Sequence, residues 1–282
     1  MKLNYFYAKI NSEMTKRFKR TLFYSAVAVF LVLSYVVILY AQGYKYSFSE
    51  NRFFKTGAVY LKVNTGADVY MDDKLLGNTS FFGNSYRIEG LLPDKYAIRI
   101  QRNNYSTWQK QITVDEGFVS EFSKILIISK DESDSEELDE EIISLFPSPA
   151  PKTTKGSVSP SPAPAAELFV IKKGVLLTTG ETPEKVANGV KGFALSKDKH
   201  KLAWWTANEV WVMWLNDADY QPYHKKGDKE LITRFSTQIK KVAWFRDDDH
   251  LIVDSTSSPQ VDSGTYRILE IDTRGGINIV EV

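Results

Sequence analysis

The sequence predicts an all-β protein behind one N-terminal transmembrane helix, and three observations support this fold class. Residues 21–44 contain no charged side chain. After them, apolar and polar residues alternate with the period of a β-strand, between frequent turn signals. Near the C-terminus a strand–turn–strand pattern recurs at a shift of 49 residues. We therefore expect a transmembrane helix, a small antiparallel β-sandwich and a partial β-propeller-like repeat, in that order.

The uncharged segment predicts a membrane-spanning helix. Residues 22–40 read LFYSAVAVFLVLSYVVILY, and roughly 20 such residues match a hydrocarbon core of about 30 Å. Six basic residues and one acidic residue precede it, so the positive-inside rule places the N-terminus in the cytoplasm and the chain after residue 45 outside. A signal peptide cleaved near residues 41–43 is the alternative, but Leu39 stands where cleavage needs a small residue.

Composition excludes several classes of function. The chain has 282 residues, 36 basic and 35 acidic side chains, a net charge of +1 and no cysteine. A near-neutral chain without a basic patch gives no case for nucleic-acid binding. Without cysteine there are no disulfides, thiolate metal sites, cysteine nucleophiles or lipids attached through cysteine.

The first exported segment alternates like a set of short strands. Val59, Leu61 and Val63 point to one side of a strand, while the residues between them point to the other. Turn signals separate the strands at spacings of about eight to twelve residues, which is typical of an antiparallel sandwich. They are the tripeptides at residues 64–66, 72–74, 82–84 and 92–94 and the pair Asn103-Asn104.

This segment resembles the PEGA domain, a small β-sandwich module of exported bacterial and archaeal proteins. Residues 90–96 read GLLPDKY, close to the family's Gly-Leu-x-Pro-Gly-x-Tyr, and Asn104-Tyr105 stand at its later Gly-Tyr. Of the naming motif itself only Gly66-Ala67 remain. The resemblance covers residues 57–127 and implies structural roles, in turns or core, for Gly66, Ala67, Gly77, Gly90, Pro93, Tyr96, Tyr105 and Trp108.

A linker is predicted between the two β-rich parts. Residues 131–141 read DESDSEELDEE, with eight acids in eleven residues, and residues 146–166 hold six of the ten prolines. Like-charge repulsion and the missing proline N–H both oppose packing. A calcium loop is the sharper alternative, but the acidic run lacks spaced oxygen ligands and a central glycine.

The C-terminal part contains two copies of a repeat and resembles TolB-type or WD-repeat-like β-propellers. Residues 192–205 align with residues 241–254, and each copy has a charged turn between two strands. Propellers usually need four to eight blades. A truncated reading frame, an open two-blade sheet and completion by other chains are the three explanations, of which we favour truncation.

Few residues suggest chemistry. The sequence has no Gly-x-Ser-x-Gly elbow, phosphate loop or His-Glu-x-x-His pair, so we expect no enzyme, no metal and no cofactor. His200 and His250 fall at equivalent turns of the repeat, where we expect surface residues, and residues 247–249 read as a solvated acidic turn. Five tryptophans lie within 41 residues. Most of them lie on strongly apolar strands, so burial in the core of the blades is favoured over a platform for sugar rings. Adjacent Trp204 and Trp205 must face opposite sides of a strand, so one of them is the candidate for exposed ligand contact.

The predicted order is a basic cytoplasmic tail (1–20), a signal anchor (21–44), a PEGA-like sandwich (45–129), an acidic and proline-rich linker (130–167) and a partial propeller (168–282). This organisation predicts a non-catalytic, single-pass protein of the bacterial cell membrane that binds or scaffolds a cell-wall polymer or envelope protein. The alternative is a sensor or accessory subunit of a membrane complex, which would need a cytoplasmic partner for output.

Overall fold

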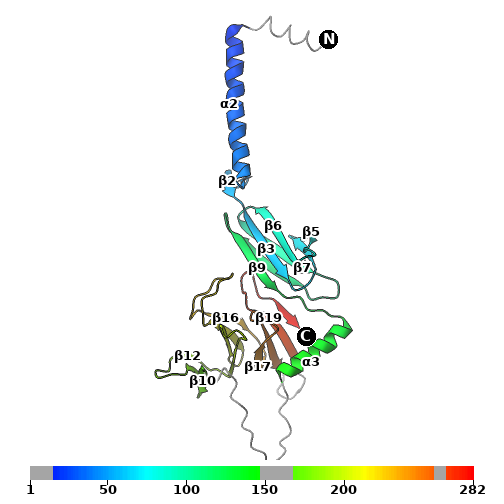
Figure 1. The fold of residues 1–282 in the computed structure, drawn as a ribbon, viewed down its shortest axis with the longest axis vertical. Helices are drawn as coiled ribbons and strands as arrows, with labels where there is room; N and C mark the ends of the chain where they lie inside the picture. Colours follow the sequence, from blue (N-terminus) through cyan, green and yellow to red (C-terminus); the bar gives the residue numbers. More distant parts are fainter. Residues whose placement is uncertain (1–14, 147–167, 257–264) are drawn as a thin grey trace, which may run out of the picture.

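The computed structural model describes residues 15–146, 168–256 and 265–282. The described chain is mostly β, with small and mainly antiparallel sheets and one N-terminal apolar helix (Figure 1). Its described strands close neither a barrel nor a propeller. Most of the predicted basic tail and the proline-rich part of the linker lie outside the described residues.

Helix α2 (Lys16–Ala41) is long and apolar enough to cross a membrane, as the uncharged run predicts. Its N-cap is Thr15, whose Oγ1 accepts a hydrogen bond from the backbone N–H of Phe18 at 3.4 Å. None of its residues is buried, and in Figure 1 it stands clear of the β-sheets for most of its length. The helix therefore gains almost nothing from packing within the chain.

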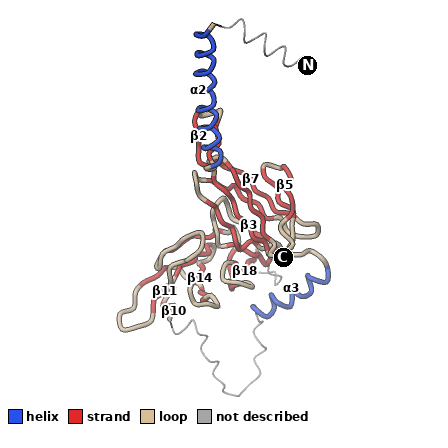
Figure 2. The backbone as a smooth tube through the Cα atoms, turned by 45° about the horizontal axis from the view of Figure 1, so that its top comes forward, coloured by secondary structure: helices blue, strands red, loops and turns tan. Residues whose placement is uncertain are grey.

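A short hairpin follows the helix. Strands β1 (Tyr44–Ser47) and β2 (Arg52–Lys55) pair antiparallel, with Tyr44 opposite Lys55 at the base and Ser47 opposite Arg52 at the tip. In Figure 2 the hairpin lies beside the end of α2 rather than beyond it.

The first β body consists of two sheets that enclose one core. The first sheet has the order β6-β3-β9, with β3 and β9 parallel, and the second has the order β5-β4-β7-β8. The strands are β3 (Gly57–Val63), β4 (Asp68–Met71), β5 (Lys74–Asn78), β6 (Ser85–Leu91), β7 (Asp94–Gln101), β8 (Trp108–Val114) and β9 (Val119–Ile125).

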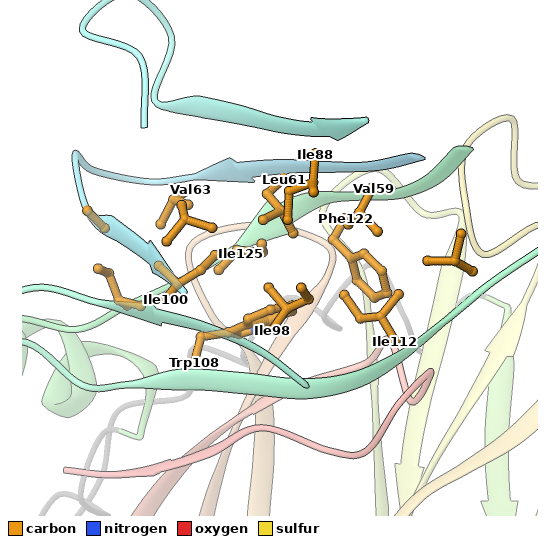
Figure 3. Packing of buried hydrophobic residues seen from close by; sticks show 14 of the residues in the cluster. Val59, Leu61, Val63, Ile88, Ile98, Ile100, Trp108, Ile112, Phe122 and Ile125 are labelled. Atoms are coloured by element: carbon orange, nitrogen blue, oxygen red, sulfur yellow. The ribbon is translucent and has the colours of Figure 1, made fainter. Parts of the chain in front are cut away.

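Alternating residues of both sheets meet in this core. Figure 3 shows Val59 and Leu61 of the first sheet facing Ile98 and Ile112 of the second, with Trp108 among them. All five side chains are at most 2% exposed. The alternation read from the sequence therefore placed this core correctly.

The predicted turns also fall between strands. Each of the five turn signals from residue 64 to residue 104 lies at or between the ends of consecutive strands from β3 to β8. Asn104 has a φ of 59°, a left-handed conformation that asparagine tolerates better than most residues.

The second β body contains three sheets of consecutive antiparallel strands. The two copies of the repeat form two four-stranded sheets with the same strand order, β13-β14-β15-β16 and β17-β18-β19-β20. The strands are β10 (Phe169–Lys172), β11 (Val175–Thr178), β12 (Lys185–Asn188), β13 (Gly192–Leu195), β14 (Lys201–Trp205), β15 (Glu209–Trp214), β16 (Lys229–Arg234), β17 (Gln238–Trp244), β18 (His250–Thr256), β19 (Thr265–Glu270) and β20 (Ile279–Glu281).

These three sheets stack through separate apolar clusters. Leu202 and Trp204 on one face of β14 pack with Phe169 and Leu176 of the β10–β12 sheet. The opposite face of β14 belongs to a second cluster, shared with Leu251 and other residues of the β17–β20 sheet. Strand β14 is therefore buried on both faces, which explains why residues 202–205 are all apolar.

The prediction of an unpacked acidic linker is wrong for residues 132–145. They form helix α3 (Glu132–Leu145), which covers the outer face of the β17–β20 sheet. Leu138 and Ile142, one helical turn apart, are 7% and 2% exposed and pack against Ile252 and Ile268. Glu132 and Asp134 lie in the first turn, where acidic residues interact favourably with the positive end of the helix dipole, so these two charges support the helix.

We expect Ile142→Ala to lower the free energy of unfolding by about 2–5 kcal/mol, because it removes buried volume at the contact between α3 and the sheet. Neighbouring Ile143 is 65% exposed, so Ile143→Ala is the matched control, with an expected change within about 0.5 kcal/mol. Urea denaturation followed by tryptophan fluorescence measures both. Equal effects of the two substitutions would contradict the packing of α3.

Candidate functional site

The most unusual feature of the described chain is a buried ion pair between the two β bodies. Lys110 on β8 has a fully buried side chain, and its Nζ lies 3.3 Å from Oε1 of Glu270 on β19, which is 5% exposed. Trp108 donates from Nε1 to the other carboxylate oxygen of Glu270 at 2.8 Å. Lys110 and Trp108 of the first β body thus bind both carboxylate oxygens of Glu270, which is buried in the second β body.

The location of Lys110 follows from strand alternation. On β8, residues 108, 110, 112 and 114 are buried while the residues between them are exposed. Lys110 therefore lies on the face that carries Trp108 and Ile112, and its amine is 5.6 Å from the ring centroid of Phe122. The sequence signal for this position is a lysine in the inward register of an amphipathic strand.

Burial is the largest cause of the pKa shift of Glu270. It raises the pKa of this carboxyl group, and Lys110 acts in the opposite direction. The nearby carboxylate of Asp272 adds to the upward shift of the pKa. The pairing with Lys110 and the hydrogen bond from Trp108 therefore offset part of the cost of burying this carboxyl group.

A turn that contains Gly275 adds to the contact between the two β bodies, which we call the joint. The backbone N–H of Gln111 donates to the carbonyl oxygen of Gly275 at 2.9 Å. Gly275 has a φ of +69°, and a Cβ atom added to it would lie 2.4 Å from the carbonyl oxygen of Gln111. Only glycine suits both this conformation and this close approach.

Arg274 extends the joint to β9 and to the loop after β15. Its Nη2 donates to the carbonyl oxygen of Glu121 at 2.6 Å, and its Nη1 donates to Oε1 of Gln221 at 2.8 Å. The Oδ2 atom of Asp272, 2.6 Å from Nη2, balances its charge. The guanidinium group therefore links three segments that are distant in sequence.

A second polar cluster lies next to the joint. The Nζ of Lys201 donates to the hydroxyl oxygen of Tyr220, to the carbonyl oxygen of Asp248 and to Oδ1 of Asp249, at 2.6, 2.6 and 2.8 Å. Burial raises the pKa of Tyr220, and the charge of Asp249 raises it further. The three acceptors occupy all three donor positions of the amine, so Lys201 links its strand to Tyr220 and to the turn at residues 248–249.

The cleft between the two clusters is small and contains one stacked histidine. The ring of His224 lies 3.5 Å, centroid to centroid, from that of Trp214, with an interplanar angle of 14°. Burial lowers the pKa of His224, while Glu230 and Asp228 at 3.7 and 3.9 Å act against that shift. In the part of the chain that the structure describes, no group of three or more His, Asp or Glu residues could hold a metal ion.

The favoured expectation that the tryptophans lie in the core is confirmed for Trp204 and Trp205, and the candidate exposed contact at one of them is wrong. Trp204 and Trp205 do face opposite sides of β14, but they are 3% and 8% exposed. Trp204 stacks on Trp211 at 5.9 Å and 9°. The reason is that sheets lie on both sides of β14, so neither face meets solvent.

The expected surface position is also wrong for one of the two histidines. The side chain of His200 is 58% exposed, but His250 is 3% exposed and its Nδ1 lies 2.9 Å from Oδ1 of Asp247. The acidic turn is not fully solvated either, because Asp249 is 8% exposed and binds Lys201. The two turns are equivalent in the repeat, so the sequence predicts the same exposure for both. The turn at residues 247–249 differs because it lies at the contact between the two β bodies.

The residues implied by the PEGA resemblance lie in turns and in the first core. Trp108 and Ala67 belong to the core, and Tyr96 and Tyr105 pack against it. Gly66 and Pro93 lie in turns, while Gly77 and Gly90 have positive φ within β5 and β6.

The comparisons with known proteins give no relative: no protein-family model matches the chain, and the search of curated proteins finds no match.

We expect Lys110→Met to lower the free energy of unfolding by about 3–5 kcal/mol, because it leaves the carboxylate of Glu270 buried without its cation. Adding Glu270→Gln removes that charge, so the double variant should be more stable than Lys110→Met alone. Urea denaturation measures both variants.

The control is the exposed ion pair of Arg87 and Glu89, 2.7 Å apart with side chains 56% and 68% exposed. Arg87→Met should change stability by at most about 1 kcal/mol. If Lys110→Met costs no more than Arg87→Met, the buried pair does not stabilise the joint.

Proposed function

We propose that this chain is a non-catalytic, single-span membrane protein that displays a rigid β body outside the cytoplasm and binds or scaffolds cell-envelope material. The observation that carries the proposal is the unpacked apolar helix α2, which leads through one short hairpin into the joined β bodies. A helix of this composition needs an apolar surrounding that the described chain does not provide. The basic residues before it favour a cytoplasmic N-terminus.

The proposed fold identities rest on sheet arrangement and sequence resemblance. Two facing sheets around one core support a PEGA-like sandwich for the first body. Consecutive four-stranded antiparallel sheets that stack face to face support propeller-like blades for the second. Helix α3 covers one end of that stack, as capping elements do in repeat proteins.

The polar groups at the joint support a non-catalytic role. Lys110 and Lys201 are the most buried amines described here, and each is held by carboxylate and carbonyl oxygens. Their contacts join segments instead of facing an open cleft. Stabilisation of the joint is the role that this geometry supports best.

An exposed aromatic pair is the proposed contact surface in place of the tryptophans. Phe81 and Phe82, in the turn between β5 and β6, are 91% and 88% exposed, and their rings lie 5.2 Å apart. Ser85, just after this turn, pairs with Lys62 near the end of β3 that is farther from α2. The pair is therefore displayed away from the helix, where aromatic faces can stack on apolar faces of sugars.

We expect residues 45–282 to co-sediment with insoluble cell-wall material, and F81S/F82S to weaken retention about tenfold, which corresponds to about 1.4 kcal/mol. Retention through ring stacking should persist in high salt, because salt screens charges rather than apolar contacts. Tyr223→Ser, at another exposed ring (71%), is the control and should retain binding. Absence of retention above an unrelated protein would reject wall binding and direct the search to membrane protein partners.

A further inference from the structure

The hairpin after α2 folds back along the helix. Tyr40, in the last turn of α2, has its ring centroid 6.5 Å from that of Phe53 on β2. Phe53 pairs with Tyr46, one residue pair before the hairpin tip. Figure 2 shows the hairpin beside the end of the helix. The tip of the hairpin therefore lies level with helix residues before Tyr40.

The tip carries aromatic surface that no described part of the chain covers. Phe48 is 86% exposed, and its ring is 5.1 Å from that of Tyr46, which in turn lies 5.1 Å from Phe53. With Tyr40, which is 54% exposed, these rings form a continuous aromatic group beside the apolar helix. Below we call Tyr40, Tyr46, Phe48 and Phe53 the aromatic foot.

The base of the hairpin is fixed to the first β body. Lys45 donates from Nζ to the carbonyl oxygen of Gly90 at 2.6 Å, and the backbone N–H of Lys55 donates to Oε1 of Glu116 at 2.9 Å. Thr56 donates from its backbone N–H and its hydroxyl group to the carbonyl oxygen of Gly43, both at 2.8 Å. The position of the foot is thus linked to the orientation of the whole body.

Physical chemistry limits the depth of the foot. A two-stranded hairpin has open edges whose N–H and C=O groups need water or headgroups, so it cannot lie in hydrocarbon. Glu50 and Arg52 at the tip, 3.1 Å apart and both exposed, also need a polar surrounding. The amphipathic rings of tyrosine, here Tyr40 and Tyr46, favour the interface between membrane and water. The foot meets all three conditions at the lipid headgroup layer.

We propose that the aromatic foot is a second membrane contact, which inserts Phe48 at the lipid interface and holds the β body at a fixed orientation above the bilayer. The proposal rests on the proposed membrane span of α2. The occupant of this surface is lipid, because the aromatic foot is continuous with α2 and its tip lies beside helix residues before Tyr40. The equally exposed Phe81 and Phe82 lie at the opposite end of the first body and have no such neighbour.

The absence of cysteine allows a direct test with the full chain, since any introduced cysteine is unique. We would reconstitute the variants Phe48→Cys, Phe82→Cys and Leu31→Cys separately into phosphatidylcholine vesicles and label each with an environment-sensitive fluorophore. Positions 48 and 82 are both highly exposed, so neither substitution disturbs the core. Lipids with nitroxide groups at shallow or deep acyl positions then report the depth of each label.

The proposal predicts that the label at position 48 is quenched most by shallow nitroxide, the label at position 31 most by deep nitroxide, and the label at position 82 by neither. A label at position 48 that behaves like that at position 82, while position 31 is quenched, would overturn the foot and leave the span intact. Quenching at position 82 as well would overturn a contact specific to the hairpin. No quenching at position 31 would reject the span itself.

Discussion

The amine of Lys110 and the carboxylate of Glu270 lie at the contact between two β bodies, and their side chains are 0% and 5% exposed. A buried charge without a partner costs several kcal/mol. Each β body contributes one charge of the pair, so both charges are neutralised only while the two bodies remain in contact. Trp108 extends this dependence into the first core, because its indole N–H binds the same carboxylate while its ring packs in that core. The joint therefore couples the packing of one body to the position of the other.

The neighbouring elements reinforce this joint on both sides. Arg274 bridges the C-terminal turn, the loop at Gln221 and β9, and α3 covers the outer face of the last sheet. At the opposite end, the hairpin links the first body to α2. A body of this kind suits display, because a contact surface on a membrane protein is effective only when its orientation is defined. That is the physical basis of the binding or scaffolding role that we propose.

The sequence predicts features that depend on a local pattern within one element, and it does not predict features that depend on contacts between distant elements. The apolar run of α2, the alternation around Leu61 and the repeat near the C-terminus are local patterns, and the structure contains the corresponding helix, core and paired sheets. The burial of both Trp204 and Trp205 depends on sheets that cover both faces of β14, which no local pattern reports. Helix α3 depends likewise on a receiving sheet, and the buried pair depends on two residues 160 positions apart in the chain.

The central claim is that the buried pair makes the two β bodies one rigid unit. The direct measurement is the distance between spin labels on Lys74→Cys in the first body and Thr182→Cys in the second, both exposed positions in a chain without other cysteines. Pulsed electron paramagnetic resonance should give one narrow distance distribution, and Lys110→Met should broaden it. A broad distribution in the chain with Lys110 present, as expected for two bodies on a flexible linker, would contradict the account.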